Sequence, residues 1–385
     1  SSATRRQALS PESTIGIADG GRAEPIEVGP ADRIDAGEAD GAPDVVAREE
    51  AELPVPLGDD GDVVFVSADD AAIDWARLRP EQTLRGDALR RPVIEVPAAG
   101  LELGVSGVTI ENVDFVARQP LRAAAMLTLR GWKTTLRGCS FQTTGDIPPA
   151  ESPAALAWNC ELNPLDANAD LSTGELELRD VALRRVSAGV TCRLAAGMIL
   201  RFDNVLCLET GAAVEFDRFP TSDELAMVSL SRVTLRGARS LVRVGCDEIP
   251  PAAGKLEIEA TGCAFVLPAA AALVFFEGEE RPGAMLNALR WHGQGCVLSP
   301  RSRLAIWRTA EGRMLAAADD AVPIEGMVRG EVGFAGTPDE SAAGSRIVRW
   351  QAPLISSQPP GIDDTAISLP RADELVSSAR QELSR

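Results

Sequence analysis

The chain has 385 residues, which is long enough for two average domains or one long repetitive domain. Its 57 acidic and 38 basic side chains give a formal net charge of −19, which argues against nucleic acid or an anionic membrane surface as a partner. The single histidine, His292, excludes most catalytic triads and most histidine-built metal sites, and we expect no cofactor.

Residues 1–62 differ in composition from the rest of the chain. They contain 15 Asp and Glu against 5 Arg, are rich in Pro and Gly, and include no aromatic residue. Such a segment buries too little apolar surface to offset the entropy of ordering it. The composition therefore predicts a disordered acidic linker.

The cysteine spacing and the lengths of the apolar runs exclude some metal and redox motifs and a membrane-spanning segment within this sequence. The seven cysteines include no C-x-x-C pair, which excludes zinc ribbons and thioredoxin-like redox motifs. No apolar run approaches the roughly 20 residues that span a bilayer. The chain begins with Ser1 rather than Met, so we expect it to be a piece of a longer protein.

From Val63 onwards, short strands with a period of two recur for more than 200 residues. They align on one apolar anchor each, at intervals of 26, 42, 24, 28, 30 and 33 residues: Val113, Cys139, Val181, Val205, Val233, Cys263 and, more weakly, Cys296. A second strand set falls between them, at 126–130, 189–194, 213–219, 241–244, 273–276 and 304–307. Self-similarity at this period predicts a solenoid, and the signatures of WD40 and leucine-rich repeats are absent.

The residue before each anchor carries the strongest local signal. Most of these residues tolerate the left-handed backbone region that a tight bend between two sheets requires, with Arg232 as the exception. They are Asn112, Gly138, Asp180, Asn204, Arg232, Gly262 and Gly295. We expect the alternate positions before each bend, Ile110, Leu136, Leu178, Phe202 and Leu230, to face the core, together with the thiols of Cys139, Cys263 and Cys296.

These patterns predict an all-β fold, a right-handed parallel β-helix of the pectin-lyase-like type. We expect the β-helix over residues 63–310, an irregular β-rich cap or flank over 311–365, and a tail over 366–385 with one short amphipathic helix.

Several stretches resemble the β-helical C-terminal regions of planctomycete serine/threonine protein kinases. They are Leu84-Arg-Gly, Arg91-Pro-Val-Ile-Glu-Val, Leu101-Glu-Leu, Val108-Thr-Ile-Glu-Asn-Val-Asp-Phe115, Leu176-Glu-Leu-Arg-Asp-Val181, Ser345-Arg-Ile-Val-Arg-Trp-Gln-Ala-Pro-Leu354 and Pro359-Pro-Gly-Ile362. The resemblance implies a sensing or scaffolding region outside the cytoplasmic membrane, preceded in the parent protein by a kinase domain and attached to the membrane only through a segment outside this chain. With two lysines and one histidine, this chain holds no set of kinase motifs, so no catalytic residue is carried over.

The alternative is a carbohydrate-active enzyme of the pectate-lyase or polygalacturonase type, which needs converging carboxylates. The outward positions instead mix charges, with Glu177 near Arg179 and Arg201 and with Asp203 near Arg201, as on a solvated face. We therefore expect no catalytic residue and a non-catalytic module. Its ligand is unknown, with a polysaccharide or another cell-envelope component as the candidates.

Two further features allow a functional and a structural interpretation. Asp166, Asn168 and Asp170, followed by Glu177, match the ligand order of a calcium loop, but Leu171 stands where the loop needs glycine. A polar loop is the favoured interpretation. Five tryptophans could stack on sugars but are expected to pack in the core, with Trp307 and Trp350 sealing the last coil: Trp132, Trp158, Trp291, Trp307 and Trp350.

Overall fold

The computed structural model describes most of the chain from Val63 to Leu369, and all described residues belong to one unit, Leu53–Arg385. The described residues are 63–66, 73, 75, 78–144, 147, 151–160, 174–221, 224–246, 254–278, 282–318, 322, 324–338, 342–351 and 359–369. The predicted linker over 1–62, the residues at 166, 168 and 170 that match a calcium loop, and the predicted tail beyond residue 369 lie outside them.

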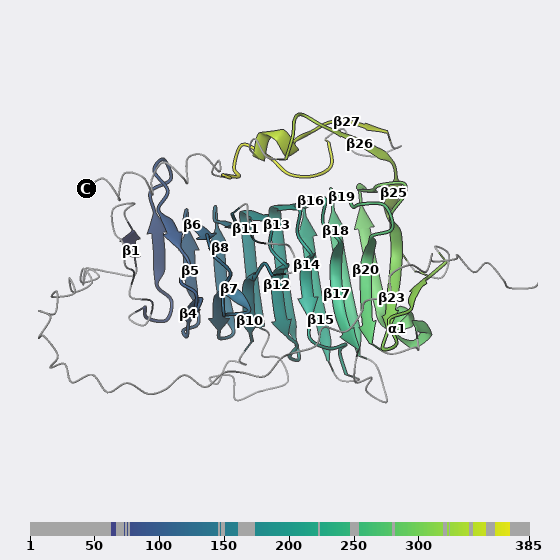
Figure 1. Cartoon of the computed structure of the whole chain (residues 1–385), viewed down its shortest axis with the longest axis horizontal. Helices are drawn as coiled ribbons and strands as arrows, with labels where there is room; N and C mark the ends of the chain where they lie inside the picture. Colours follow the sequence, from purple (N-terminus) through teal and green to yellow (C-terminus); the bar gives the residue numbers. More distant parts are fainter. Residues whose placement is uncertain are drawn as a thin grey trace, which may run out of the picture. The chain divides into compact units, whose positions relative to one another are not determined.

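The described residues form an all-β structure in which almost every strand pairing is parallel (Figure 1). The larger sheet consists of two rows that share β11 (Gly174–Arg184) and β13 (Met198–Leu208). The other strands of the first row are β1 (Val63–Val66), β2 (Thr83–Gly86), β5 (Val108–Glu111), β8 (Lys133–Arg137), β15 (Leu225–Ser231), β18 (Lys255–Thr261) and β21 (Leu289–Gln294). Those of the second row are β3 (Val93–Glu95), β6 (Asp114–Ala117), β9 (Ser140–Thr143), β16 (Thr234–Arg236), β19 (Ala264–Val266), β22 (Cys296–Leu298) and β25 (Met327–Arg329).

A second sheet lies opposite and is parallel except at its last strand. Its strands in spatial order are β4 (Leu101–Leu103), β7 (Ala125–Arg130), β10 (Ala154–Asn159), β12 (Ala188–Arg193), β14 (Ala212–Phe216), β17 (Ser240–Cys246), β20 (Ala272–Gly278), β23 (Arg303–Thr309) and the antiparallel β24 (Met314–Ala316). A short helix, α1 (Pro282–Ala288), precedes β21. The chain forms a strand of the first row, then one of the second row and then one of this sheet, and we call each such sequence of strands a pass. The strands of each pass pair with those of the pass before it.

The bends between the two rows confirm the sequence prediction. All seven residues before the anchors have positive φ, from 54° at Asp180 to 64° at Gly295, and Arg232 shares this conformation at 55°. The main-chain ladder continues through the bends, because the amides of Asn112 and Gly138 donate to the carbonyls of Arg137 and Arg179 on the next pass. The left-handed residue thus turns the chain without interrupting the pairing between passes.

The core lies between the two sheets and is built from in-register ladders of apolar side chains. The predicted inward positions before the bends, with the anchors after them, are fully or almost fully buried, including the three predicted thiols. Phe115 and Phe141 of successive passes stack with ring centroids 4.6 Å apart, and Trp75 lies 6.0 Å from Phe115. Each pass therefore buries its apolar surface mainly against its two neighbours.

The second strand set is confirmed, but two further parallel strands of the second sheet, β4 and β10, were not predicted from the sequence. The second of these supplies the sheet within the 42-residue interval between Cys139 and Val181. Trp158, Trp291 and Trp307 are buried, and Trp307 stacks on Phe276 at 5.1 Å near the last pass. Trp350 does not seal that pass, because it packs on the outer face of the second row with Val332 and Phe334.

The predicted flank has a definite location. After β25 the chain forms the antiparallel pair β26 (Glu331–Phe334) and β27 (Ile347–Gln351), with a 3-10 helix, Ala342–Ser345, between them. This segment and residues 359–369 pack on the outer face of the second row, along one edge of the stack (Figure 1, yellow). Outward residues of that row such as Leu206 and Leu208 are consequently buried.

Candidate functional site

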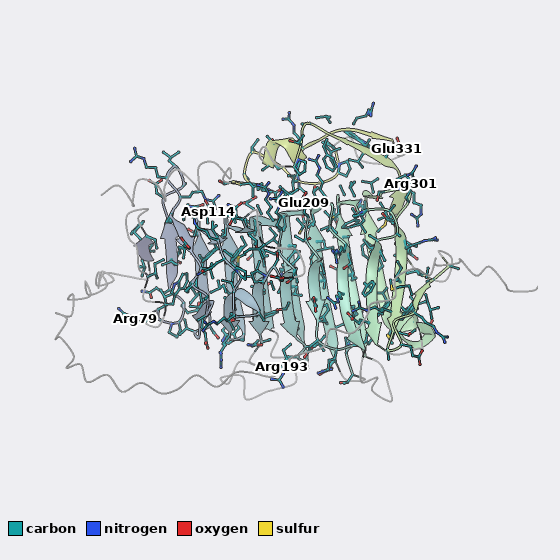
Figure 2. The ribbon with its side chains drawn as sticks, in the orientation of Figure 1. Arg79, Asp114, Arg193, Glu209, Arg301 and Glu331 are labelled. Carbon is teal, nitrogen blue, oxygen red and sulfur yellow. The ribbon has the colours of Figure 1, made fainter. Side chains whose placement is uncertain are left out.

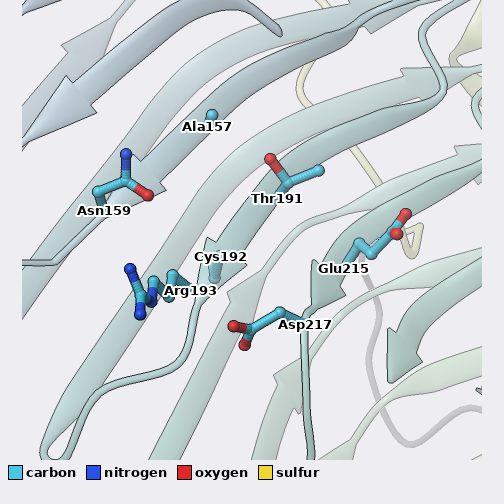
Figure 3. A pocket seen from close by; sticks show the side chains of 7 residues that line it. All are labelled: Ala157, Asn159, Thr191, Cys192, Arg193, Glu215 and Asp217. Atoms are coloured by element: carbon cyan, nitrogen blue, oxygen red, sulfur yellow. The ribbon is translucent and has the colours of Figure 1, made fainter. Parts of the chain in front are cut away.

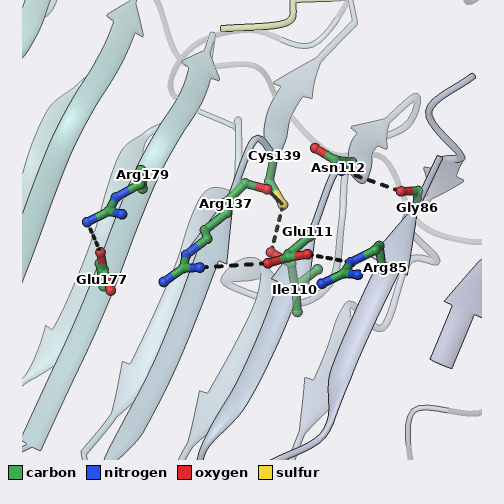
Figure 4. Close-up of polar contacts among 9 residues, drawn as sticks. All are labelled: Arg85, Gly86, Ile110, Glu111, Asn112, Arg137, Cys139, Glu177 and Arg179. Carbon is green, nitrogen blue, oxygen red and sulfur yellow. Dashed lines mark hydrogen bonds and ion pairs between the residues drawn. The ribbon is translucent and has the colours of Figure 1, made fainter. Parts of the chain in front are cut away.

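The outer face of the first row carries paired charges over its first passes, as predicted. Glu111 contacts both Arg85, at 2.6 Å, and Arg137, at 3.8 Å (Figure 4). Arg179 contacts Glu177 at 2.9 Å and Asp203 at 3.3 Å. These side chains are partly exposed, so each pair contributes at most about 1 kcal/mol.

One predicted pairing on this face differs in the structure. Arg201 is the in-register neighbour of Glu177, but its ion pair forms with Glu175, at 2.6 Å. Asp203 takes Arg179 instead of Arg201. The face is still one of compensated charges, as predicted, because every one of these carboxylates has an arginine partner.

The later passes of the first row present a polar face without ion pairs among the described residues. Its outward side chains on β15, β18 and β21 are Met227, Ser229, Ser231, Glu257, Glu259, Thr261, Arg290, His292 and Gln294. His292 is exposed and neighbours Glu259 in register. Within the described ranges, no group of three or more His, Cys, Asp or Glu side chains is placed to hold a metal ion.

The candidate site is a hollow of about 240 Å³ on the outer side of the second sheet. Three neighbouring strands, β10, β12 and β14, contribute to it, and Asp217 follows β14 directly. It is lined by Ala157, Asn159, Thr191, Cys192, Arg193, Glu215 and Asp217, and Figure 3 shows their side chains around one space. Arg193 and the second-row residue Asp114 lie at opposite edges of the stack in Figure 2.

The parallel register brings the lining together. Ala157, Thr191 and Glu215 are directly paired across the three strands, and Asn159 pairs with Arg193. The next residue inward on β12, Cys192, is buried in the core. Alternation along each strand therefore separates a polar outer row from an apolar inner one.

Most polar groups of the hollow already have protein partners. The Asp217 carboxylate accepts from the Leu194 amide at 2.9 Å, and the Thr191 hydroxyl donates to the Leu156 carbonyl at 3.2 Å. Glu215 accepts from Arg243 at 3.4 Å, and Arg243 also contacts Glu277. These contacts hold the acidic side of the hollow in place.

Two groups in the hollow differ from the rest. The Asn159 amide and the Arg193 guanidinium have no side-chain partner in the described part of the chain, and Arg193 is exposed. A guanidinium binds carboxylates and phosphates in a fork geometry, and an amide both donates and accepts. Among the described residues of the hollow, these two side chains are therefore the ones available to hydrogen-bond a ligand.

Cys192 is the thiol among the described residues that line the hollow, but its side chain lies in the core. Burial, and to a lesser extent Cys160 and Asp217, raises the pKa of the Cys192 thiol well above its usual value. A thiol that stays protonated at neutral pH is a poor nucleophile. Cys192 is therefore a packing residue rather than a reactive group.

This hollow was not predicted from the sequence. Asn159 and Arg193 end strands that are 34 residues apart in the chain, and β10 itself was missed. The alternation in Ala154-Ala-Leu-Ala-Trp-Asn159 is a local signal for strand β10, but the pairing of Asn159 with Arg193 follows only from the register of β10 and β12. Glu177, proposed as the last calcium ligand, contacts Arg179 on the other sheet.

Comparisons with known proteins add no assignment. No family model, no curated protein and no solved structure matches this chain significantly. No helix in the described part of the chain is long and apolar enough to cross a membrane.

Proposed function

We propose that residues 63–310 form a right-handed parallel β-helix of the pectin-lyase-like type and act as a non-catalytic binding or scaffolding module. The in-register parallel pairing of successive passes supports the helical path. The right hand is supported by the general preference of parallel crossovers, about 98% of which are right-handed.

The observation that carries the binding proposal is the hollow with Asn159 and Arg193. Its volume of about 240 Å³ is below the roughly 300–1,000 Å³ of pockets that enclose a drug-sized ligand. A hollow of this size on an open sheet suits one unit of a longer ligand. The free guanidinium favours an acidic group on that unit, so an acidic polysaccharide of the cell envelope is the ligand class that we propose.

The parent protein and its location are proposed from the sequence resemblance. We propose that the module is the sensor region of a serine/threonine protein kinase and lies outside the cytoplasmic membrane. The test is the reading frame upstream of Ser1: kinase motifs followed by an apolar span support the proposal. A secretory signal directly before Ser1 would exclude it.

Binding is tested with immobilised acidic and neutral polysaccharides and the chain carrying Arg193→Ala or Asn159→Ala. Arg193→Ala is expected to weaken binding to the acidic polymers at least tenfold, because it removes the cation without a side-chain partner among the described residues that line the hollow. The matched control is Arg290→Ala, which removes an exposed arginine from the other sheet and changes the net charge equally. Equal losses for both variants would show that only net charge matters, and the hollow would then not be the site.

One observation favours a second candidate, polysaccharide cleavage. Two carboxylates, Glu215 and Asp217, line the same hollow as Arg193, and catalytic sites of this kind need such a set. Glu215 already accepts a hydrogen bond from Arg243, and Asp217 accepts one from the Leu194 amide. Carboxylates held in this way favour binding over catalysis. New reducing ends after incubation with an acidic polymer, lost in Asp217→Asn, would establish the enzyme instead.

A further inference from the structure

Residues 359–369, here called the strap, lie on the bends of the second row instead of joining a sheet. Three residues of the stacked passes, here called the body, hydrogen-bond to the strap main chain: Asn204, Thr234 and Gly262. We call these three residues, together with Arg232 on the pass between Asn204 and Gly262, the clamp. Three clamp residues are the left-handed bend residues of successive passes. The strap therefore crosses several passes, whereas a strand of a sheet belongs to a single pass.

The clamp contacts main-chain groups in order along the strap. The amide of Gly361 donates to the Gly262 carbonyl at 2.6 Å, and that of Ile362 donates to the Thr234 hydroxyl at 3.0 Å. Asn204 holds both main-chain groups of Asp363: its Oδ1 accepts from the amide at 2.7 Å, and its Nδ2 donates to the carbonyl at 3.0 Å. Such contacts fix the register of a bound peptide.

Side chains of the strap add selectivity. A Cβ on Gly361 would lie 2.5 Å from the Thr234 hydroxyl oxygen, so only glycine fits there, and its φ of +92° also favours glycine. Ile362, Ile367 and Leu369 are buried in one cluster with Ala182, Leu206, Leu208 and Ala342. The outer face of the second row is therefore an apolar surface that the strap covers.

Arg232 is the bend residue that sequence reasoning could not explain. Its left-handed φ of 55° is unfavourable for arginine, whereas the neighbouring bends use Asn, Asp or Gly. Within the described residues, its buried Nε has no hydrogen-bond partner. Arg232 lies on the pass between Gly262 and Asn204, which bind Gly361 and Asp363 of the strap. Hydrogen bonds from Thr365 hold the pKa of Asp363 below its usual range, and the positive charge of Arg232 acts more weakly in the same direction.

We infer that the clamp and the apolar face beside it form a peptide-recognition site, which the strap occupies as an internal ligand. The partner that fits is a segment with glycine, an apolar residue and an acidic residue in succession, then a turn, and then two apolar residues at the positions of Ile367 and Leu369. The strap makes four main-chain bonds to the clamp and forms no ladder, so a segment of the same chemistry from another chain can replace it. Arg232 keeps its strained backbone because it selects the acidic residue.

The experiment uses the whole chain with a protease recognition sequence in place of residues 352–358. After cleavage, the fragment 359–385 is expected to stay with the body and to be displaced by excess synthetic peptide 359–369, as measured by size-exclusion chromatography with mass spectrometry. A peptide carrying Asp363→Arg should displace it at least tenfold less well. On a body carrying Arg232→Asp, that peptide should recover most of the difference.

Backbone strain is separated from recognition by two glycine variants. Arg232→Gly and Ala270→Gly each relieve a left-handed residue, and Ala270 lies in a turn before β20, in the other sheet. Arg232→Gly is expected to keep the unfolding temperature and to weaken peptide binding several-fold, whereas Ala270→Gly leaves binding unchanged.

Two results would overturn the inference. A cleaved fragment that no excess of peptide displaces is a permanent part of the fold. Equal displacement by the wild-type peptide and by the Asp363→Arg peptide shows that the clamp does not select the acidic residue. Dimers formed by exchange of straps before cleavage would support the recognition site and identify a second copy as the source of the segment.

Discussion

At the scale of single residues, the bends show how one backbone conformation selects residue types. Seven successive bends adopt the left-handed conformation, and the ladder of main-chain hydrogen bonds passes through them. Asn112 adds a side-chain bond from its Nδ2 to the Gly86 carbonyl of the preceding pass, at 3.5 Å (Figure 4). Alanine substitutions at the glycine bends can separate the cost of backbone strain from the cost of a steric clash, because the space around these glycines differs.

Gly262→Ala and Gly138→Ala are expected to destabilise the protein to different degrees. A Cβ on Gly262 meets nothing within 4 Å, so alanine there adds only the strain of a left-handed residue, about 1–2 kcal/mol. A Cβ on Gly138 would also lie 2.6 Å from Asn112 Oδ1, so its cost is larger. Urea unfolding measures both, with Gly104→Ala as the control because Gly104 has open space and no positive φ. Equal costs at 262 and 104 would contradict the strain argument.

Glu224 predicts a specific acid sensitivity. Its carboxylate forms two 2.6 Å bonds to Arg218 and accepts from the Thr221 amide at 2.7 Å, and the Arg218 bonds lower its pKa from 4.5 to about 2. A lowered pKa means that the stabilisation is complete above pH 4.5 and is lost as the pH falls towards 2.

Glu224→Gln should therefore lower the unfolding temperature at pH 7 and flatten its fall between pH 5 and pH 3. Glu102→Gln is the control, because Glu102 pairs with Arg130 at 2.7 Å with both side chains at least half exposed. A decline in Glu224→Gln as steep as in the wild type would assign the acid sensitivity to other groups.

The buried thiols should be unreactive in the folded protein. Burial is the main cause that raises the pKa of Cys139 and that of Cys207 to about 12. Iodoacetamide at pH 8, followed by mass spectrometry, is expected to leave both unlabelled until denaturant is added. Cys160 is only half-buried and serves as the internal reference. Labelling of Cys139 as fast as Cys160 would show that the stack opens locally around β9.

At the scale of strands, the sequence determines which face of a strand is buried more directly than which strands touch. Alternation placed Ile110, Leu136 and Leu178 in the core correctly, because the period of two is a local property. Arg201 is in register with Glu177 but pairs with Glu175, two residues earlier on β11, and this diagonal choice does not follow from the local pattern. The hollow was missed for the same reason, since Asn159 and Arg193 meet only through the register of β10 and β12.

The stacked phenylalanines of β6 and β9 should dominate the local stability of the first passes. Phe141 is fully buried and stacks on Phe115 at 4.6 Å with an interplanar angle of 7°. Phe141→Ala is expected to cost about 3–5 kcal/mol, and Phe141→Leu clearly less because it refills most of the volume. Phe65→Ala is the control, since Phe65 is 74% exposed. Urea denaturation gives the three values, and similar losses for Phe141→Leu and Phe141→Ala would mean that the stacking geometry matters more than the volume.

At the scale of the whole unit, pairing connects each pass to its neighbours and to nothing more distant. Within the described ranges, only the strap and the β26–β27 pair cross several passes, on the outer face of the second row. In such an arrangement stability is close to a sum of pass and interface contributions, and damage at one end remains near that end. Parallel pairing continues past the predicted boundary at residue 310, because Ile324 forms a parallel bridge with Trp291 and β25 pairs in parallel with β22.

Trp307 offers a test of this locality. It is buried, stacks on Phe276 at 5.1 Å and belongs to β23, the last parallel strand of the second sheet. Trp307→Ala leaves a cavity in the last pass and weakens the cover of a strand edge. Hydrogen–deuterium exchange should therefore accelerate at least tenfold in β20 and β23 and stay unchanged in β5 and β8. Met314→Ala, at a residue of β24 that is 56% exposed, is the control and should change neither region. If Trp307→Ala accelerates exchange equally in all four strands, the unit unfolds as one cooperative body, and stability cannot be treated as a sum over passes.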